Sequence, residues 1–258
     1  MSTQLRLLAA VSLLFATTAG ANDRSYYTLQ SGIHHGPTPI HDHGIRGEGQ
    51  IIAILDTGLD YDSCYFAETD QSAPPVNTGT PGGPLQTDRV DGSRRKVIAY
   101  DFLFSCDQYP GQRGCDDPRD PLSWDNTSHG THTAGSAAAD SGEYLLHEFG
   151  DAIAPGAKLV IQDAGYNGGD NCSQFPGLGC PIRNFTAALD QAYIQGARIH
   201  SNSWGDRQGT PMGTTPPTGN YSASARDLDA FVQTHPDMLI LVATGNAGAL
   251  GPLSLIHI

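Results

Sequence analysis

The chain has 258 residues, a formal net charge of −13 at pH 7 and 38% hydrophobic residues. A chain of this length can bury a core as one domain, and 31 Gly and 17 Pro residues are too few for a disordered or fibrous protein. Because 27 acidic residues outnumber 14 basic ones, the sequence lacks the positive charge that binds a phosphate backbone. We therefore expect no nucleic-acid partner.

Residues 1–21 have the pattern of a secretory signal peptide. Arg6 supplies the positive charge, residues 7–15 form an apolar run too short to span a bilayer, and residues 19–21 are small, as at a cleavage site. An uncleaved membrane anchor is the alternative, but no stop-transfer pattern follows. We predict a secreted, extracellular protein that has no membrane contact after cleavage and begins with a short N-terminal segment, residues 22–40.

Export would place the five cysteines in an oxidising compartment, where disulfides persist. Cys106 lies close to Cys115 and Cys172 close to Cys180, so we expect two local bridges, although the sequence alone leaves other pairings open. Cys64 is left over. It either stays buried and reduced or lacks a partner in this chain.

Five short apolar runs predict strands that are buried on both faces, as in a parallel sheet. They are residues 50–55, 96–102, 158–162, 197–202 and 238–243. Helical spacing of apolar residues runs from Phe185 to Tyr193 before Gly196, and it recurs around Leu228 and Phe231. We interpret residues 64–94 and 104–127 as surface loops, and residues 41–252 as one α/β unit.

Polar motifs follow several of these strands, at the sheet edge where α/β proteins bind ligands. They are residues 54–58 (ILDTG), 202–205 (NSWG) and 243–246 (ATGN), and residues 128–135 (SHGTHTAG) open a further helix. In order and spacing, these motifs resemble those of the subtilases, the subtilisin-like serine peptidases, over roughly residues 40–250. The resemblance implies a three-layer α/β/α sandwich with a seven-stranded, mostly parallel sheet. It also implies an endopeptidase that acts on polypeptides.

The resemblance assigns roles to individual residues. Asp56 would accept the Nδ1 proton of His129, which would be the general base, and Asn246 would be the oxyanion donor. His132, one turn along the same helix, would pack or form a hydrogen bond.

The resemblance also implies a substrate-binding edge. The residues expected there are Ser203, Trp204, Gly205 and, on the other side of the substrate, Gly165. Trp204 is equally interpretable as a core aromatic.

The nucleophile motif of the family, Gly-Thr-Ser-Met-Ala, does not occur in the chain, and Ser254 lacks its flanking glycine and helix. Residues 253–258 can be encoded by a sequence that resembles the mosaic end of transposase-based sequencing libraries. We interpret them as an artefactual tail on a truncated peptidase domain, with a natural end as the alternative. We expect the chain as written to be inactive and unstable, with the apolar faces of residues 51–55 and 238–243 bared.

Three functions are alternatives to a serine peptidase. A secreted pseudopeptidase that binds extended peptides is the non-catalytic alternative. The paired Asp-Thr-Gly at Asp56 and Asp-Ser-Gly at Asp140 suggest an aspartic peptidase, but Asp140 does not follow an apolar strand. A zinc peptidase is disfavoured because no His-Glu-x-x-His motif is present.

One acidic loop is the candidate for a metal site in this sequence. We assign no metal ligand. A loop with Asp116, Asp117, Asp120 and Asp125 could hold calcium, but a solvated acidic loop is the preferred interpretation. No sequence feature determines the oligomeric state or the preferred substrate.

Overall fold

The structure is a computed structural model, and most of the chain between residues 21 and 243 is described. The described residues are 21–80, 85, 88–111, 115–121, 124–125, 128–142, 150–165, 185–204, 221 and 223–243.

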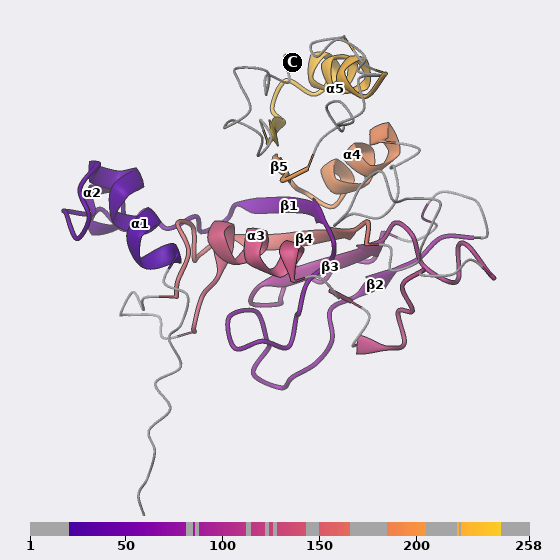
Figure 1. Ribbon diagram of the computed structural model, residues 1–258, viewed down its shortest axis with the longest axis horizontal. Helices are drawn as coiled ribbons and strands as arrows, with labels where there is room; N and C mark the ends of the chain where they lie inside the picture. Colours follow the sequence, from indigo (N-terminus) through magenta and orange to yellow (C-terminus); the bar gives the residue numbers. More distant parts are fainter. Residues whose placement is uncertain are drawn as a thin grey trace, which may run out of the picture.

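A parallel sheet forms the centre of the molecule (Figure 1), and its described part has six strands in the order β2-β3-β4-β1-β5-β6. The strands are β1 (Ile51–Asp56), β2 (Val76–Asn77), β3 (Val97–Phe102), β4 (Lys158–Asp163), β5 (Ile199–Asn202) and β6 (Leu239–Val242). Every neighbouring pair is parallel. The α/β class and the five predicted strands are therefore confirmed, whereas the two-residue strand β2 was not predicted.

Helices cover both faces of the sheet. They are α3 (His129–Ala138), α4 (Phe185–Ile194) and α5 (Ala223–Thr234). Ile52 and Ile54 of β1 share a buried cluster with Ala134 of α3, whereas Leu55 packs on the opposite face with Leu189 of α4 and Phe231 of α5. This alternation explains why β1 is apolar along its whole length.

The expected exposure of the sheet is half right. Leu239 and Leu241 of the edge strand β6 are 54% and 47% exposed. Residues 52–55 of β1, by contrast, are buried, because β1 lies inside the sheet between β4 and β5 with helices on both faces. The expectation that residues 51–55 are bared is wrong.

The segment before the sheet is more ordered than its sequence suggested. It contains α1 (Ala21–Ser31) and α2 (Pro39–Asp42), which lie beside one end of the sheet (Figure 1). The Asn22 side chain donates to the carbonyl oxygens of Gly135 and Gly150, at 3.1 and 3.0 Å. His41, 3% exposed, hydrogen-bonds the carbonyl oxygen of Ile153 at 2.8 Å. These polar contacts fasten the segment to the domain.

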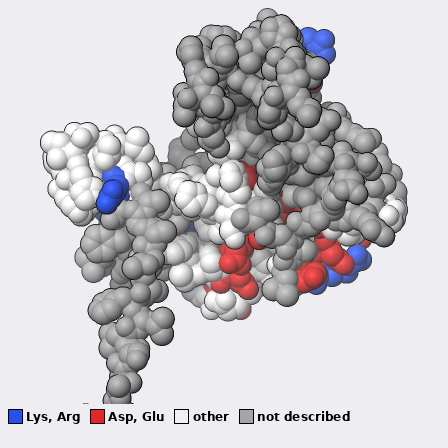
Figure 2. All heavy atoms as spheres, viewed as in Figure 1, with Lys and Arg blue, Asp and Glu red and all other residues white. Residues whose placement is uncertain are grey.

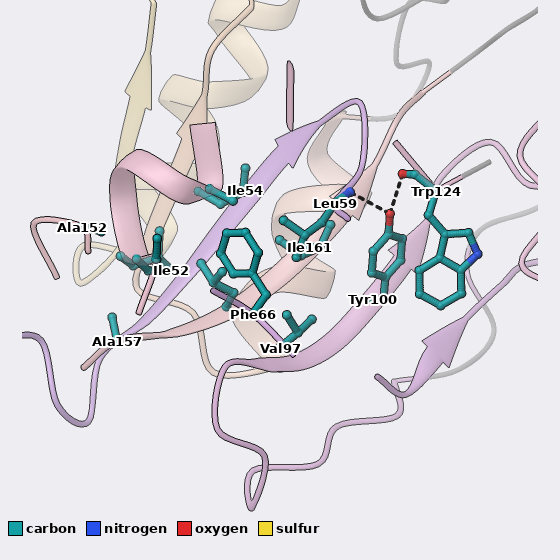
Figure 3. Packing of buried hydrophobic residues seen from close by; sticks show 14 of the residues in the cluster. Ile52, Ile54, Leu59, Phe66, Val97, Tyr100, Trp124, Ala152, Ala157 and Ile161 are labelled. Carbon is teal, nitrogen blue, oxygen red and sulfur yellow. Dashed lines mark hydrogen bonds between the residues drawn. The ribbon is translucent and has the colours of Figure 1, made fainter. Parts of the chain in front are cut away.

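An aromatic group closes the core near the carboxyl ends of the strands (Figure 3). The rings of Tyr100 and Trp124 lie with centroids 4.6 Å apart, and both side chains are buried. The Tyr100 hydroxyl accepts the amide of Leu59 at 3.0 Å and lies 2.8 Å from the carbonyl oxygen of Trp124. One buried side chain thus joins the loop after β1 to the loop before α3.

The cysteine prediction is confirmed in one pair. Cys106 and Cys115 form a disulfide. Cys64 is free among the described residues and exposed, so the first of its two interpretations, a buried thiol, is wrong, whereas the second, a cysteine without a partner in this chain, stays a prediction. Cys172 and Cys180 lie outside the described residues.

The described surface shows the acidic character of the sequence. In the view of Figure 2, acidic side chains gather near the centre while Lys and Arg are seen at the periphery. None of the helices in the described ranges is both long and apolar enough to cross a membrane. Residues 1–20, where the signal peptide is predicted, lie outside these ranges.

Candidate active site

Asp56 is the last residue of β1 and lies in the middle of the sheet, where it is 1% exposed. Its Oδ1 atom lies 2.6 Å from Nδ1 of His129 and accepts the Thr57 amide at 2.8 Å. Its Oδ2 atom lies 3.3 Å from the Thr133 hydroxyl, which also lies 3.0 Å from the carbonyl oxygen of Gly130. Contacts to both oxygens hold the carboxylate in one orientation, directed at the imidazole.

His129 is the first residue of α3, and its side chain is 49% exposed. Because a carboxylate can only accept from a neutral imidazole, the contact with Asp56 assigns the ring proton to Nδ1. Nε2 then carries a lone pair and can accept a proton. A half-exposed imidazole oriented by a buried carboxylate is the arrangement of a general base.

The start of α3 is capped by residues from outside the helix. A Ser before a helix is a common N-cap, but Ser128 has a left-handed backbone (φ 59°) and its side chain makes no capping bond. Instead, the Thr57 hydroxyl oxygen accepts the Gly130 amide at 2.9 Å. Asp125 Oδ2 accepts the Thr131 amide at 2.8 Å. The helix end is therefore tied to the end of β1 and to the loop before α3.

Two glycines allow these segments to touch. A Cβ atom on Gly58, where φ is +107°, would lie 1.6 Å from the carbonyl oxygen of Trp124. A Cβ atom on Gly130 would lie 2.1 Å from the carbonyl oxygen of Gly58. Since real Cβ atoms do not approach so closely, only glycine fits at either position while the backbones keep this contact.

A buried pair of acids lies behind the site, beside the neighbouring strand end. Asp163, paired with Asp56 in the sheet register, has Oδ2 2.9 Å from the Tyr100 hydroxyl, which also lies 2.8 Å from the carbonyl oxygen of Trp124. Burial raises the pKa of Asp163 well above its usual value and that of Asp116 to about 7. Below that pH the pair adds little negative charge beside Asp56.

The residues predicted for the substrate edge are partly described. Ser203 and Trp204 directly follow β5, the strand beside β1. The Trp204 indole donates to the carbonyl oxygen of Leu55 at 3.0 Å and lies edge-on to Phe185, which supports the core interpretation of this aromatic. Gly205 and Asn246 lie outside the described residues.

Gly165 follows β4 on the other side of β1 and is buried. Its amide donates to Asp163 Oδ1 at 2.8 Å, and a Cβ atom there would lie 2.9 Å from the carbonyl oxygen of Thr57. Gly165 thus supports the floor of the site, and its contact with a substrate stays a prediction.

His132 does not have the expected packing role. It is exposed, and within the described part of the chain no hydrogen bond of its side chain is found. The reason is its position on α3: the buried face is formed by Gly130, Ala134 and Ala138, and His132 points away from it.

The four loop carboxylates do not converge on a calcium site. Asp116 is buried near Asp163, Asp117 pairs with exposed Arg119, and Asp125 binds α3. Across the described ranges, no group of three His, Cys, Asp or Glu side chains is placed to share a metal ion. These residues do not fit a calcium ligand set.

An aspartic peptidase pair is not formed either. Asp56 contacts the first residue of α3, whereas Asp140 follows the end of that helix and pairs with Arg95 at 3.0 Å. Ten helical residues place these carboxylates about 15 Å apart, too far to share a proton.

The sequence predicted Asp56 and His129 but assigned no role in the site to Thr57 or Thr133. It placed Asp125 in a solvated acidic loop, with calcium binding as the alternative. The available signal was the position of Thr57, directly after the strand-end Asp, and of Thr133 on the same helix face as His129.

Known proteins resemble this chain over most of its length. The family profile described as the Subtilase family matches residues 47–255. The chain is 30% identical over 205 residues to the serine protease/ABC transporter B family protein tagD of Dictyostelium discoideum, covering 78% of this chain and 9% of that protein. It is 30% identical over 212 residues to the subtilisin-like protease SBT2.2 of Arabidopsis thaliana, covering 78% and 23%. The chain thus spans less than a quarter of these relatives.

Solved structures that match part of this chain include the CspB protease of Clostridium perfringens, with a TM-score of 0.48 and 18% identity. That match covers 82% of this chain and 39% of the other.

Proposed function

The chain belongs to the subtilase family, and from this premise we propose that it is part of a secreted serine endopeptidase with Asp56 and His129 as two members of the triad. The observation that carries the proposal is the 2.6 Å contact between His129 Nδ1 and Asp56 Oδ1, with Asp56 almost fully buried.

In this proposal His129 is the general base. Its Nε2 atom takes the proton of a serine hydroxyl as that oxygen attacks the carbonyl carbon of the scissile peptide bond, and later gives the proton to the leaving amine. Asp56 holds the imidazole in the required tautomer and stabilises the imidazolium while it exists. Asp56 needs no proton of its own, and its contacts with Thr57 and Thr133 keep it oriented throughout.

The serine and the oxyanion site complete the proposal. No Gly-Thr-Ser-Met-Ala motif occurs in the 258 residues, so we place the nucleophile in sequence that follows this chain in the gene. Asn246, three residues after the described end of the β6 segment, would donate its side-chain amide to the oxyanion. β6 lies beside β5 in the sheet, so the sequence after it leaves the same edge as Ser203.

The proposed substrates are extended polypeptides. An extended segment can pair with main chain, and pockets for alternate side chains then set the preference. Ser203, Trp204, Gly205 and Gly165 are the proposed neighbours of that segment. Secretion rests on the signal pattern of residues 1–21.

The first test is to sequence the locus beyond codon 252, express the complete product and treat it with a serine-directed fluorophosphonate. We expect a Gly-Thr-Ser motif, labelling of its serine and hydrolysis of casein. Asp56→Asn should lower kcat by about 10⁴-fold, as in the equivalent change of a serine-protease triad, and His129→Ala by more.

A matched control is His132→Ala, which removes an exposed imidazole from the same helix and should leave kcat within about twofold. A natural stop codon after residue 258, together with peptide binding without hydrolysis, would instead favour the pseudopeptidase. Hydrolysis by the 258-residue chain that a fluorophosphonate blocks would show that the nucleophile has been misplaced.

A further inference from the structure

Three segments meet around one carboxylate at the start of α3. Asp125 Oδ1 accepts the hydroxyl proton of Thr57 at 2.9 Å, and Asp125 Oδ2 accepts the amide and the hydroxyl of Thr131, the amide at 2.8 Å. The Thr131 hydroxyl oxygen in turn accepts the Asp60 amide at 2.9 Å. Asp125 is therefore bonded to the loop after β1 on one side and to the first turn of α3 on the other.

The sequence positions of these contacts matter for the site. Thr57 directly follows Asp56, and its hydroxyl accepts the amide of Gly130, which directly follows His129. Thr57, next to Asp56, is thus hydrogen-bonded to Gly130, next to His129. Asp125 adds a second link, because it accepts hydrogen bonds from both Thr57 and Thr131. A carboxylate at a helix N-terminus is also favoured by the helix dipole, which strengthens these bonds.

We propose that Asp125 is a positioning residue, which acts through Thr57 and Thr131 to hold the His129 imidazole against the Asp56 carboxylate. The proposal rests on the function proposed above, because it concerns the same two residues, Asp56 and His129. It goes beyond that function in assigning a role to Asp125, a residue outside the proposed triad.

The backbone contacts make such a role necessary. Ser128 supplies no side-chain cap, so the amides of Gly130 and Thr131 depend on Thr57 and Asp125. Without the carboxylate, the Thr131 amide and the Thr57 hydroxyl proton lose their acceptor, and the first helical turn can fray. His129 is the first residue of that turn, so its ring would leave the 2.6 Å contact for part of the time.

The test compares Asp125→Ala with Asp125→Asn by NMR of histidine-labelled protein. The readout is the downfield proton resonance of the His129 Nδ1–H group, identified by its loss in His129→Ala. We expect Asp125→Ala to broaden or abolish this resonance, whereas Asp125→Asn, which keeps an acceptor oxygen for α3, retains it. The control Asp117→Asn removes a carboxylate from the same loop that pairs with Arg119, and it should match the wild type.

A second pair of variants covers the case in which Asp125→Ala does not fold. Thr57→Val removes the hydroxyl with little change of shape and should weaken the resonance, whereas Thr57→Ser should restore it. In the complete peptidase, Asp125→Ala should lower kcat by about 10- to 100-fold with little change in KM, the usual cost of a misplaced catalytic group.

Two results would overturn the proposal. A wild-type resonance in Asp125→Ala and Thr57→Val, with only a lower melting temperature, would show a purely structural role. Equal changes in Asp125→Asn and Asp125→Ala would show that charge, not placement, is what matters. The resonance reports the His129–Asp56 contact without turnover, so an intact signal in a complete gene product that does not hydrolyse peptides would refute the peptidase function alone.

Discussion

The Nε2 atom of His200 lies 2.9 Å from the Oε1 atom of Gln162, although His200 is on β5, Gln162 is on β4, and β1 runs between them. In the register, Ala53 of β1 lies beside His200 and Leu55 of β1 lies beside Gln162, so the bond runs diagonally across β1. The chain of contacts continues from Gln162 to Asp101 on β3, at 3.5 Å. Polar side chains thus connect strands inside an otherwise apolar layer.

Enlarging Ala53 should break this connection. Ala53→Leu places three further carbon atoms at a fully buried position beside His200, so we expect the free energy of unfolding to fall by about 1–3 kcal/mol from overpacking and by more if His200 and Gln162 are left unpaired. Urea denaturation measures the change. Ala230→Leu on the exposed side of α5 is the control and should change the value by less than about 0.5 kcal/mol. Equal changes in the free energy of unfolding of Ala53→Leu and Ala230→Leu would show that the His200–Gln162 bond does not need a small residue on β1.

His200 should also make stability sensitive to acid. Burial lowers its pKa to about 3, so between pH 6.5 and 3 the unfolded chain binds a proton that the folded chain does not. The contribution of this group to the free energy of unfolding is therefore lost as pH falls, by about 2–3 kcal/mol from pH 6 to pH 4. The difference between wild type and His200→Gln, measured by urea denaturation across this range, isolates the effect.

Buried acids titrate in the same range with the opposite sign, so the comparison with the variant is essential. Burial raises the pKa of Asp101 to about 6, and that of Asp116 to about 7, so their contributions to stability fall as pH rises. A pH dependence of His200→Gln that parallels the wild type would show that His200 is protonated without cost or is not buried.

The disulfide should stabilise the loop between β3 and α3. Cys106 and Cys115 close a short loop with a sequence separation of 9, for which chain entropy predicts up to about 2–3 kcal/mol. We expect the double variant Cys106→Ala/Cys115→Ala to lose no more than this, because backbone bonds between Cys106 and Asp116 remain. Cys64→Ser, at an exposed free thiol, is the control. In non-reducing peptide mapping, a peptide that joins Cys64 to Cys106 would contradict the pairing.

Part of this structure could be predicted from local pattern. β1 is predictable because Ile52 and Ile54 face one helical layer and Ala53 and Leu55 the other, which yields an unbroken apolar run. The pairing of Asp56 with His129 was predictable only through the motifs, because 73 residues separate them.

Other features depend on tertiary contacts that leave no local signal. β2 has only two residues and exists because Val76 and Asn77 pair with β3. The sequence around Asp125 indicates only an acidic loop. Its hydrogen bonds join it to Thr57, far away in the chain, and to Thr131, and such contacts leave no local pattern. The N-terminal segment was assigned no structure. It is attached through contacts such as that of Asn22 with Gly135, which are far apart in the sequence and leave no local pattern.

Gly58 should be the position in the site least tolerant of a side chain. Its φ of +107° disfavours any L residue, and the added Cβ atom of Gly58→Ala would lie 1.6 Å from the Trp124 carbonyl oxygen, which is backbone and cannot rotate away. We expect the free energy of unfolding to fall by more than about 3 kcal/mol, the sum of backbone strain and displaced backbone contacts.

The matched control is Gly44→Ala. Gly44 has a similarly positive φ of +75°, but nothing lies within 4 Å of its added Cβ atom, so only the backbone strain of about 1–2 kcal/mol applies. Thermal and urea unfolding of both variants separate strain from collision. Displacing Trp124 should also move Asp125, the next residue, so Gly58→Ala should weaken the His129 Nδ1–H resonance in any protein that still folds. Similar losses of stability in the two variants, with the resonance intact, would show that the loop before α3 yields to the new methyl group and that the close approach at Gly58 is not required for the site.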